Sequence, residues 1–170
     1  MIKIIDNFFK DNVLVNLQNH ITTRLQYTPQ FFQDATEKTK ENHYGDRFHL
    51  SKDANLFSLF VNTAEEKFKI KLKKVSDESG IDLRNLDHFK PHVDVATKIN
   101  ILVMLKGPTA VTNGTVFYSG SPDDCVLDIH VGFKENRAVM FPSNWVHSQH
   151  ASPVKNLRRY TATLFVEDYD

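Results

Sequence analysis

The sequence has one cysteine, no excess of either charge and no long apolar run. Cys125 has no second cysteine with which to form a disulfide within the chain, which favours a reducing compartment. Lys and Arg together number 21, as do Asp and Glu, so the chain lacks the long-range field typical of a dedicated nucleic-acid binder. The longest apolar stretch, residues 101–105, is too short to cross a bilayer. We expect a cytoplasmic protein with no membrane partner, and a nucleic-acid partner is not favoured.

The length of 170 residues suits one domain with a real hydrophobic core and is too short for two comfortable ones. Hydrophobic residues make up 41% of the chain, as in an ordinary soluble globular protein. The first residues, Met-Ile-Lys-Ile-Ile-Asp, do not have the apolar core of a signal peptide. We therefore expect residues 1–170 to form a single soluble domain.

Helical patterns dominate the first half of the chain. Residues 2–5 are short and β-branched, which predicts a first strand, and Asp11 is placed to cap a helix that carries an apolar stripe. A second helix is predicted after Asp53, because apolar residues recur there on one helical face. Residues 28–51 are polar without a steady period and indicate a loop with short elements. The alternation at residues 68–72 fits a strand as well as a helix tail.

From residue 81 onward, short apolar runs alternate with turn residues. The turns carry pairs such as Gly107-Pro108 and Asn113-Gly114. This pattern predicts an antiparallel sandwich or barrel, with helical support in roughly residues 1–80 and a β core in roughly residues 81–170. The predicted strands lie at residues 83–89, 99–105, 115–118, 125–131, 137–141, 145–150 and 160–166.

The tripeptide His92-Val93-Asp94 offers a neutral and an anionic metal ligand two positions apart. Residues at that spacing in an extended chain point to one face, and Pro91 favours extended geometry before it. Two histidines and one carboxylate hold Fe(II) in many oxygenases and leave coordination positions open for chemistry. The alternative is a surface pair, because His-x-Asp is common by chance. The third ligand has three candidates, His130, His147 and His150, and strand parity alone does not choose among them.

A possible anion anchor lies further along the chain. Arg159 and Thr161 share one face of a predicted apolar strand, and Arg158 faces the other way. A guanidinium binds a carboxylate through two parallel hydrogen bonds, and a nearby hydroxyl can add a third. The alternative is a pair of surface arginines at the start of a strand. An arginine that faces inward in so apolar a strand needs an anion, because an unpaired buried charge is costly.

Taken together, these residues resemble the 2-oxoglutarate and Fe(II)-dependent oxygenase superfamily. The match runs in order over nearly the whole chain and is strongest over residues 90–166. Residues 4–9 also resemble the opening of small, stand-alone members that are similar to prolyl hydroxylases. The matching segments are residues 92–94, 113–118, 136–147 and 159–161.

The resemblance implies a mainly β fold with N-terminal helices, namely a double-stranded β-helix, which is a distorted, cupin-like jelly roll. It selects His147 as the distal metal ligand, because this histidine follows a Phe-Pro-Ser turn, and His150 stays as the named alternative. His92, Asp94 and His147 would then bind Fe(II). An acid at position 94 argues against a halogenase, which lacks this carboxylate ligand.

The resemblance also implies roles around the co-substrate. Arg159 and Thr161 would hold the far carboxylate of 2-oxoglutarate, and Asn100 or Tyr118 would hydrogen-bond its other end. With O2, such an enzyme hydroxylates a C–H bond of a peptide side chain or a small molecule and releases succinate and CO2. Prolyl 4-hydroxylases usually have lysine where Arg159 stands, which is a departure from that subgroup.

Two other readings of these residues stay open. One is a cupin-like metalloenzyme that does not use 2-oxoglutarate, and the other is a non-catalytic β-sandwich binding module. The loop at residues 27–49 contains Phe31, Phe32, Tyr44 and Arg47 and either covers the mouth of the site or packs against the core. The sequence names neither the substrate nor the oligomeric state.

Overall fold

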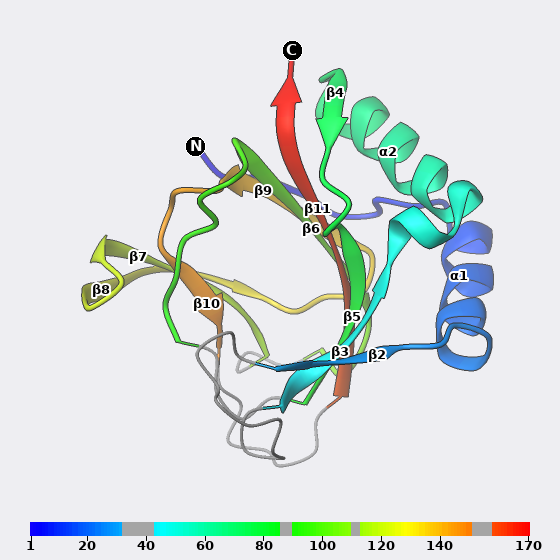
Figure 1. Ribbon diagram of the computed structural model, residues 1–170, viewed down its shortest axis with the longest axis horizontal. Helices are drawn as coiled ribbons and strands as arrows, with labels where there is room; N and C mark the ends of the chain where they lie inside the picture. Colours follow the sequence, from blue (N-terminus) through cyan, green and yellow to red (C-terminus); the bar gives the residue numbers. More distant parts are fainter. Residues whose placement is uncertain (32–42, 86–89, 110–112, 151–157) are drawn as a thin grey trace.

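The large sheet of the protein has eight strands, and the small sheet has three (Figure 1). The structure is a computed structural model, and it describes residues 1–31, 43–85, 90–109, 113–150 and 158–170. The large sheet runs β1-β9-β6-β11-β5-β3-β2, with β4 paired to β11, and the small sheet runs β10-β7-β8. In chain order, the helices and strands of the protein are β1 (Lys3–Ile5), α1 (Asp11–Thr23), β2 (Thr28–Phe31), β3 (His43–His49), a 3-10 turn (Leu50–Lys52), α2 (Ala54–Phe68), β4 (Leu72–Val75) and β5 (Gly80–Asn85). They continue with β6 (Ile99–Lys106), β7 (Gly114–Ser121), β8 (Asp124–Gly132), β9 (Arg137–Pro142), β10 (His147–Gln149) and β11 (Arg158–Tyr169).

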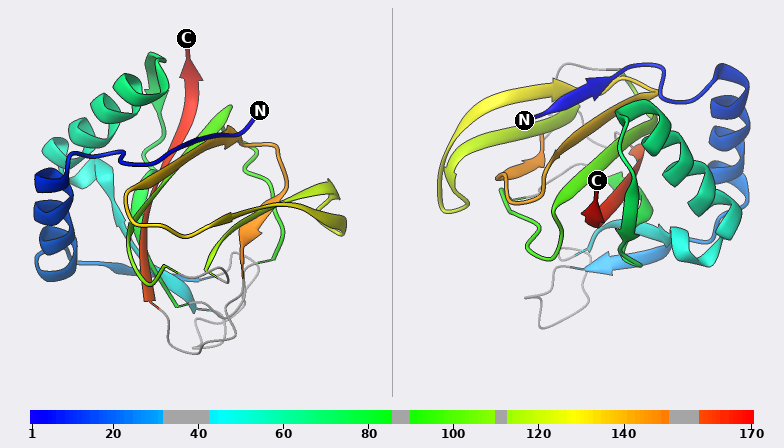
Figure 2. Two further views of the ribbon diagram at one scale, coloured as in Figure 1. Left: turned by 180° about the vertical axis from the view of Figure 1, so that it is seen from behind. Right: turned by 90° about the horizontal axis from the view of Figure 1, so that it is seen from above.

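The large sheet buries its two faces against different partners. Figure 2 shows α1 and α2 on the same side of this sheet, away from the hairpin β7–β8. Alternate residues of the central strands face the helices and form the larger core, for example Ile101 and Val103 of β6 and Leu164 of β11. Phe8 and Phe60 complete this core, and both are fully buried. Burial of these apolar side chains is the main force that holds the helices to the sheet.

A second, smaller core lies on the opposite face of the large sheet. Met104, Val139 and Phe141 from β6 and β9 pack there against Phe117 and Val131 from the small sheet. Because side chains alternate along a strand, β6 and β9 contribute to both cores. The two sheets therefore face each other in the manner of a jelly roll, with the helices outside.

The second helix begins and ends where its sequence signals lie. The side chain of Asp53 accepts hydrogen bonds from the backbone N–H groups of Asn55 and Leu56, both at 3.0 Å, which satisfies two donors that the first turn leaves open. Leu56 and Phe60, one turn apart, are buried. The helix ends at Lys69, whose φ of 57° lies in the left-handed region. The predicted start after Asp53 is thus correct.

The predicted cap of the first helix is wrong. Asp11 is the first helical residue, and Lys10 holds the capping position without a side-chain hydrogen bond. The carboxylate of Asp11 instead lies in the first turn, where a negative charge interacts favourably with the positive end of the helix dipole. Leu17 and Ile21 are buried as the apolar stripe predicts.

The first 80 residues hold both helices, as expected, and also supply β1, β2, β3 and β4 to the large sheet. Residues 28–51, expected to form a loop with short elements, contain β2 and β3, which are strands of the large sheet, and β3 pairs with β5. β3 was missed because its inward face is polar: Arg47, a charged residue, is buried there. Of the predicted strand at residues 83–89, residues 86–89 lie outside the described chain. In the part of the chain that is described, no helix is long and apolar enough to span a bilayer.

Candidate active site

Three of the predicted ligands meet between the two sheets. One potential ligand atom from each of His92, Asp94 and His147 lies within 4.8 Å of the others. His147 opens β10, and backbone hydrogen bonds of 3.0 and 2.9 Å in both directions join it to His92. The backbone N–H of Asp94 donates to the carbonyl oxygen of Ser143 at 2.9 Å. The His-x-Asp segment is therefore held against the Phe-Pro-Ser turn, which explains why ligands so far apart in sequence converge.

Backbone contacts fix the orientation of both imidazoles. The Nδ1 atom of His92 lies 2.9 Å from the carbonyl oxygen of Lys90, and that of His147 lies 2.9 Å from the carbonyl oxygen of Trp145. A carbonyl only accepts, so each Nδ1 is a protonated donor, which leaves Nε2 as the atom that can face a metal ion. Metal-binding histidines commonly use one nitrogen in this way to present the other to the ion.

The protonation states also suit metal coordination. Burial, together with the charge of His147, lowers the pKa of His92 to about 4, so its imidazole is neutral at neutral pH. Burial opposes the charge on Asp94, yet its interaction with His147, at 3.4 Å, lowers the pKa of the carboxyl. Asn100 donates to the same carboxylate at 2.5 Å. The site thus presents a neutral imidazole on His92 and an ionised carboxylate on Asp94.

Arg159 lies in the same cavity as the three candidate ligands. Its side chain enters from β11 with only 3% of its surface exposed, whereas Arg158 is exposed, in agreement with the strand parity. Nη1 donates to the carbonyl oxygen of Gly114 at 2.8 Å and to the side-chain oxygen of Asn113 at 3.3 Å. Nε has no hydrogen-bond partner in the described chain, and no described carboxylate forms an ion pair with this guanidinium. Burial, reinforced by the charge of Arg84, lowers the pKa of Arg159 to about 9.

One cavity of about 600 Å³ is lined both by the three candidate metal ligands and by Arg159. Thr161, two residues along β11, is 2% exposed and lines the cavity with Arg159. Leu102 and Phe141 form part of its apolar wall. The cavity is large enough for a metal ion and small organic molecules.

Of the two residues predicted to bind the other end of the co-substrate, Asn100 and Tyr118, only Asn100 lines the cavity. Asn100 is fully buried and lines the cavity, with its amide on Asp94. Tyr118 is not among the described residues that line the cavity, and its hydroxyl lies 2.9 Å from that of Ser148. Asn100 is therefore placed to orient the carboxylate of Asp94, and Tyr118 of β7 contacts β10 within the small sheet.

The other candidate histidines lie apart from the three ligands. His150 follows β10, and its ring centroid is 4.8 Å from that of His130. Neither belongs to the group that could hold a metal ion. The geometry therefore brings His147, and neither alternative, to His92 and Asp94.

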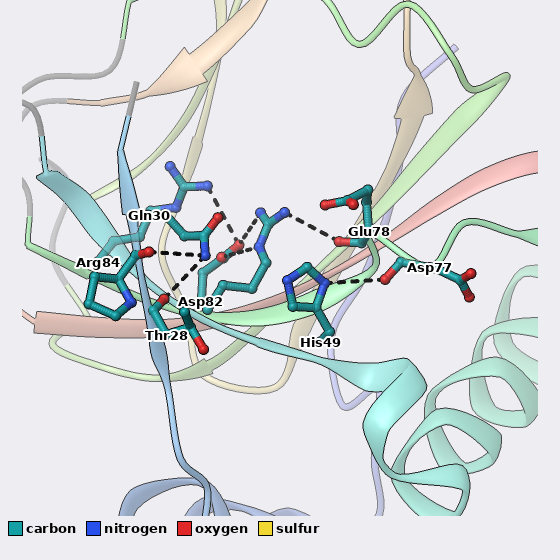
Figure 3. A network of polar contacts seen from close by, with 9 residues as sticks. Thr28, Gln30, His49, Asp77, Glu78, Asp82 and Arg84 are labelled. Carbon is teal, nitrogen blue, oxygen red and sulfur yellow. Dashed lines mark hydrogen bonds and ion pairs between the residues drawn. The ribbon is translucent and has the colours of Figure 1, made fainter. Parts of the chain in front are cut away.

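Arg47, expected either over the mouth or against the core, lines the cavity, and sequence reasoning missed its charged neighbours Asp82 and Arg84 there. Arg47 of β3 binds Asp82 of β5 through Nε at 2.7 Å and Nη2 at 3.1 Å, and the pair is buried. Arg84, two residues along β5, lies 3.5 Å from the same carboxylate (Figure 3). Burial opposes the charge of Asp82, but the two arginines lower the pKa of its carboxyl. The signal was available: two charges at alternate positions of a strand next to buried Ile81.

The comparisons with known proteins give a fold. No protein-family model and no curated protein matches the chain. Solved structures do match. A prolyl hydroxylase from Trichoplax adhaerens, in complex with a peptide fragment, has 12% identity and a TM-score of 0.66, over 98% of this chain and 83% of its own. A prolyl-4-hydroxylase from Pseudomonas putida has 12% identity and a TM-score of 0.66, over 97% of this chain and 92% of its own. The non-heme alpha ketoglutarate-dependent epimerase SnoN has 12% identity and a TM-score of 0.64, over 99% of this chain and 77% of its own.

The fold is that of the 2-oxoglutarate and Fe(II)-dependent oxygenases. The predicted double-stranded β-helix is thereby confirmed, as is the resemblance of the whole chain to these enzymes in architecture. Identities near 12% show the fold, and fold alone does not fix an activity.

Proposed function

We propose that the protein is an Fe(II)- and 2-oxoglutarate-dependent dioxygenase that hydroxylates a C–H bond of a small molecule or a peptide side chain. One observation carries the proposal. Three convergent metal ligands share a cavity with a buried arginine that has no carboxylate partner in the described chain. A structure with the same fold, the epimerase SnoN, is known in complex with Fe3+ and alpha ketoglutarate.

The donor set fits iron. Two imidazoles and one carboxylate on a single face leave the rest of the coordination sphere open, as non-heme Fe(II) oxygenases require. His92, Asp94 and His147 would hold the ion. Asn100 would keep the carboxylate of Asp94 in place through its 2.5 Å hydrogen bond.

The surroundings of Arg159 fit a dicarboxylate. An arginine buried this deeply is costly unless an anion compensates its charge. Nη1 donates to one backbone oxygen and one side-chain oxygen. Other N–H groups of the guanidinium are left for a carboxylate, among them Nε, which has no partner in the described chain. Thr161 on the same strand face can add a hydroxyl donor. A molecule with a second chelating end would reach from Arg159 to the metal ligands within the one cavity.

The chain contributes positioning and exclusion of water. When bound, iron and 2-oxoglutarate supply the oxidising chemistry, in which O2 and 2-oxoglutarate become succinate, CO2 and the hydroxyl group of the product. The ligands fix the iron, Arg159 and Thr161 fix the co-substrate, and apolar side chains such as Leu102 and Phe141 limit access of water. These roles require no proton transfer by a protein side chain.

Anaerobic titration of the protein with Fe(II) and then 2-oxoglutarate tests the proposal. Chelation of iron by 2-oxoglutarate should produce a weak visible charge-transfer band, and the Arg159→Ala variant should need far more 2-oxoglutarate to reach it. Iron binding without the band would support a cupin-like metalloenzyme that does not use 2-oxoglutarate. Failure to bind iron would support a non-catalytic β-sandwich module. Either of these results contradicts the proposal.

A further inference from the structure

We propose that Thr115 of β7 is a further ligand of the co-substrate, and that its hydroxyl donates to the far carboxylate of 2-oxoglutarate beside Arg159. The inference rests on the proposed function, because it takes the cavity to be the site of 2-oxoglutarate. It adds a donor from the small sheet to the anchor on β11 of the large sheet. Two buried polar atoms without partners in the described chain, one on each sheet, carry it.

The hydroxyl of Thr115 is buried without a hydrogen-bond partner. The residue is 3% exposed, and its Oγ1 meets neither a donor nor an acceptor in the described chain. A buried polar group without a partner is unfavourable, because it has given up its hydrogen bonds to water. Valine has nearly the same shape and would avoid this cost at a strand position. Thr115 lines the cavity, so a polar group that binds there can supply the partner.

The strand register places Thr115 between the arginine and the distal metal ligand. Side chains alternate along β7, so Thr115 faces inward with Phe117, which belongs to the smaller core. Phe117 pairs with His147 of β10, which makes His147 the diagonal neighbour of Thr115. At the other end, Arg159 donates at 2.8 Å to the carbonyl oxygen of Gly114, the residue before Thr115. A molecule that reaches from Arg159 to the metal would therefore pass Thr115.

An ionised carboxylate suits both of the unpartnered atoms. Nε of Arg159 can only donate, so its partner must be an acceptor, and the hydroxyl of Thr115 can donate to the same group. The two oxygens of a carboxylate accept about four hydrogen bonds, which is enough for the guanidinium, Thr161 and Thr115 together. Hydrogen bonds to an ionised acceptor are also the stronger kind. A neutral ligand would satisfy Thr115 but would not compensate the buried charge of Arg159.

The experiment uses the whole chain loaded with Mn(II) in place of iron. Calorimetry first measures the binding of Mn(II) and then of 2-oxoglutarate to the wild-type protein, and failure of either contradicts the proposed function itself. The test variant is Thr115→Val, which keeps the shape of the side chain and removes the hydroxyl. Thr163→Val is the matched control. Thr163 also lines the cavity, but it lies four residues beyond Arg159 on β11, about 13 Å along the strand.

Thr115→Val should weaken the affinity for 2-oxoglutarate roughly tenfold or more, the loss expected for one hydrogen bond to a charged group. Its affinity for Mn(II) should stay at the wild-type value, and Thr163→Val should bind both as wild type does. Without ligands, Thr115→Val should resist urea at least as well as wild type, because it removes a buried hydroxyl that has no partner in the described chain. If Thr115→Val does not fold, Thr115→Ser and Thr115→Ala carry the test, because they differ only in the hydroxyl; the serine should bind 2-oxoglutarate more tightly.

Four results would overturn the inference while leaving the proposed function in place. Thr115→Val could bind 2-oxoglutarate as tightly as wild type. It could lose affinity for Mn(II) as much as for 2-oxoglutarate, which would mean that Thr115 acts on His147 through β10. It could be clearly less stable than wild type without ligands, which would give its hydroxyl a structural role. Thr163→Val could lose as much affinity for 2-oxoglutarate as Thr115→Val, so that the loss would not depend on the place beside Arg159.

Discussion

Arg159 and Gly114 join the two sheets at the edge of the cavity. The guanidinium of Arg159, on β11 of the large sheet, donates to the carbonyl oxygen of Gly114, on β7 of the small sheet, at 2.8 Å. β7 pairs with β10, whose first residue is His147. The proposed co-substrate anchor and the distal metal ligand are therefore tied to one another through three strands, and a shift of the small sheet would move both.

Gly114→Ala should destabilise the fold, because the new methyl group has no room. A Cβ at this position would overlap the backbone oxygen of Val131 and lie 2.7 Å from Nε2 of His130. Backbone on the paired strand cannot move away cheaply, so we expect a loss of about 1–3 kcal/mol in the free energy of unfolding. Gly132, the cross-strand partner of Gly114, has nothing within 4 Å of such a Cβ, and Gly132→Ala serves as the control. Equal urea midpoints for the two variants would contradict the packing described for this strand pair.

Asp94→Asn and His147→Ala should abolish tight iron binding. Each removes one of three ligands, and the asparagine keeps an acceptor for the side chain of Asn100. His150→Ala should leave the iron content unchanged, because that ring lies with His130 outside the ligand group. Iron bound per chain after anaerobic loading and desalting measures the effect. Loss of iron in His150→Ala alone would show that the wrong histidine has been assigned.

Arg159→Ala and Arg158→Ala should differ sharply in affinity for 2-oxoglutarate. The first removes a buried charge that faces the cavity, and the second removes an exposed one. Loss of a charge-assisted hydrogen-bonded pair raises the dissociation constant roughly 10- to 150-fold. Removal of an exposed charge changes this constant little. Calorimetry on the Mn(II)-loaded proteins gives both constants. Similar losses in the two variants would refute the assigned strand parity.

Asp6 provides a stabilising ion pair whose contribution depends on pH. Hydrogen bonds from Arg137, at 2.7 and 3.1 Å, and from Lys134 lower the pKa of Asp6 from its ordinary 3.8 to about 2. A lowered pKa in the folded state means that the stabilisation is complete above pH 4 and is lost as the pH falls towards 2. Because a third of the side chain is exposed, Asp6→Asn should cost less than about 1 kcal/mol at pH 7. The gap in thermal midpoints between wild type and variant should narrow between pH 4 and pH 2, and a gap that widens there would contradict the ion pair.

The parts of the site that depend on strand parity and chain order could be predicted from the sequence. Arg159 and Thr161 share a face by strand parity. β6 is a nearly continuous apolar run because its two faces meet the two apolar cores, whereas alternate residues of β11 face the larger core. The choice of His147 came from the resemblance, and the hydrogen bonds between His92 and His147 give its physical basis.

The rest depends on long-range pairing that no local pattern records. β3 reads as a loop because its buried position 47 is an arginine, whose partner Asp82 lies 35 residues away. The position of Arg84 opposite Arg159 follows only from the pairing of β5 with β11. The start of α1 at Asp11 was misjudged because a carboxylate in the first turn has the same sequence signature as a cap.

A single-turnover assay tests the central claim most directly. The protein is loaded anaerobically with Fe(II) and a limiting amount of 2-oxoglutarate, exposed to O2 in the presence of ascorbate, and succinate is measured. The proposed function predicts conversion of 2-oxoglutarate to succinate and CO2 by the wild-type protein, and none by Asp94→Ala carried through the same steps. Intact 2-oxoglutarate in the iron-loaded wild-type protein, or equal succinate from Asp94→Ala, would contradict it.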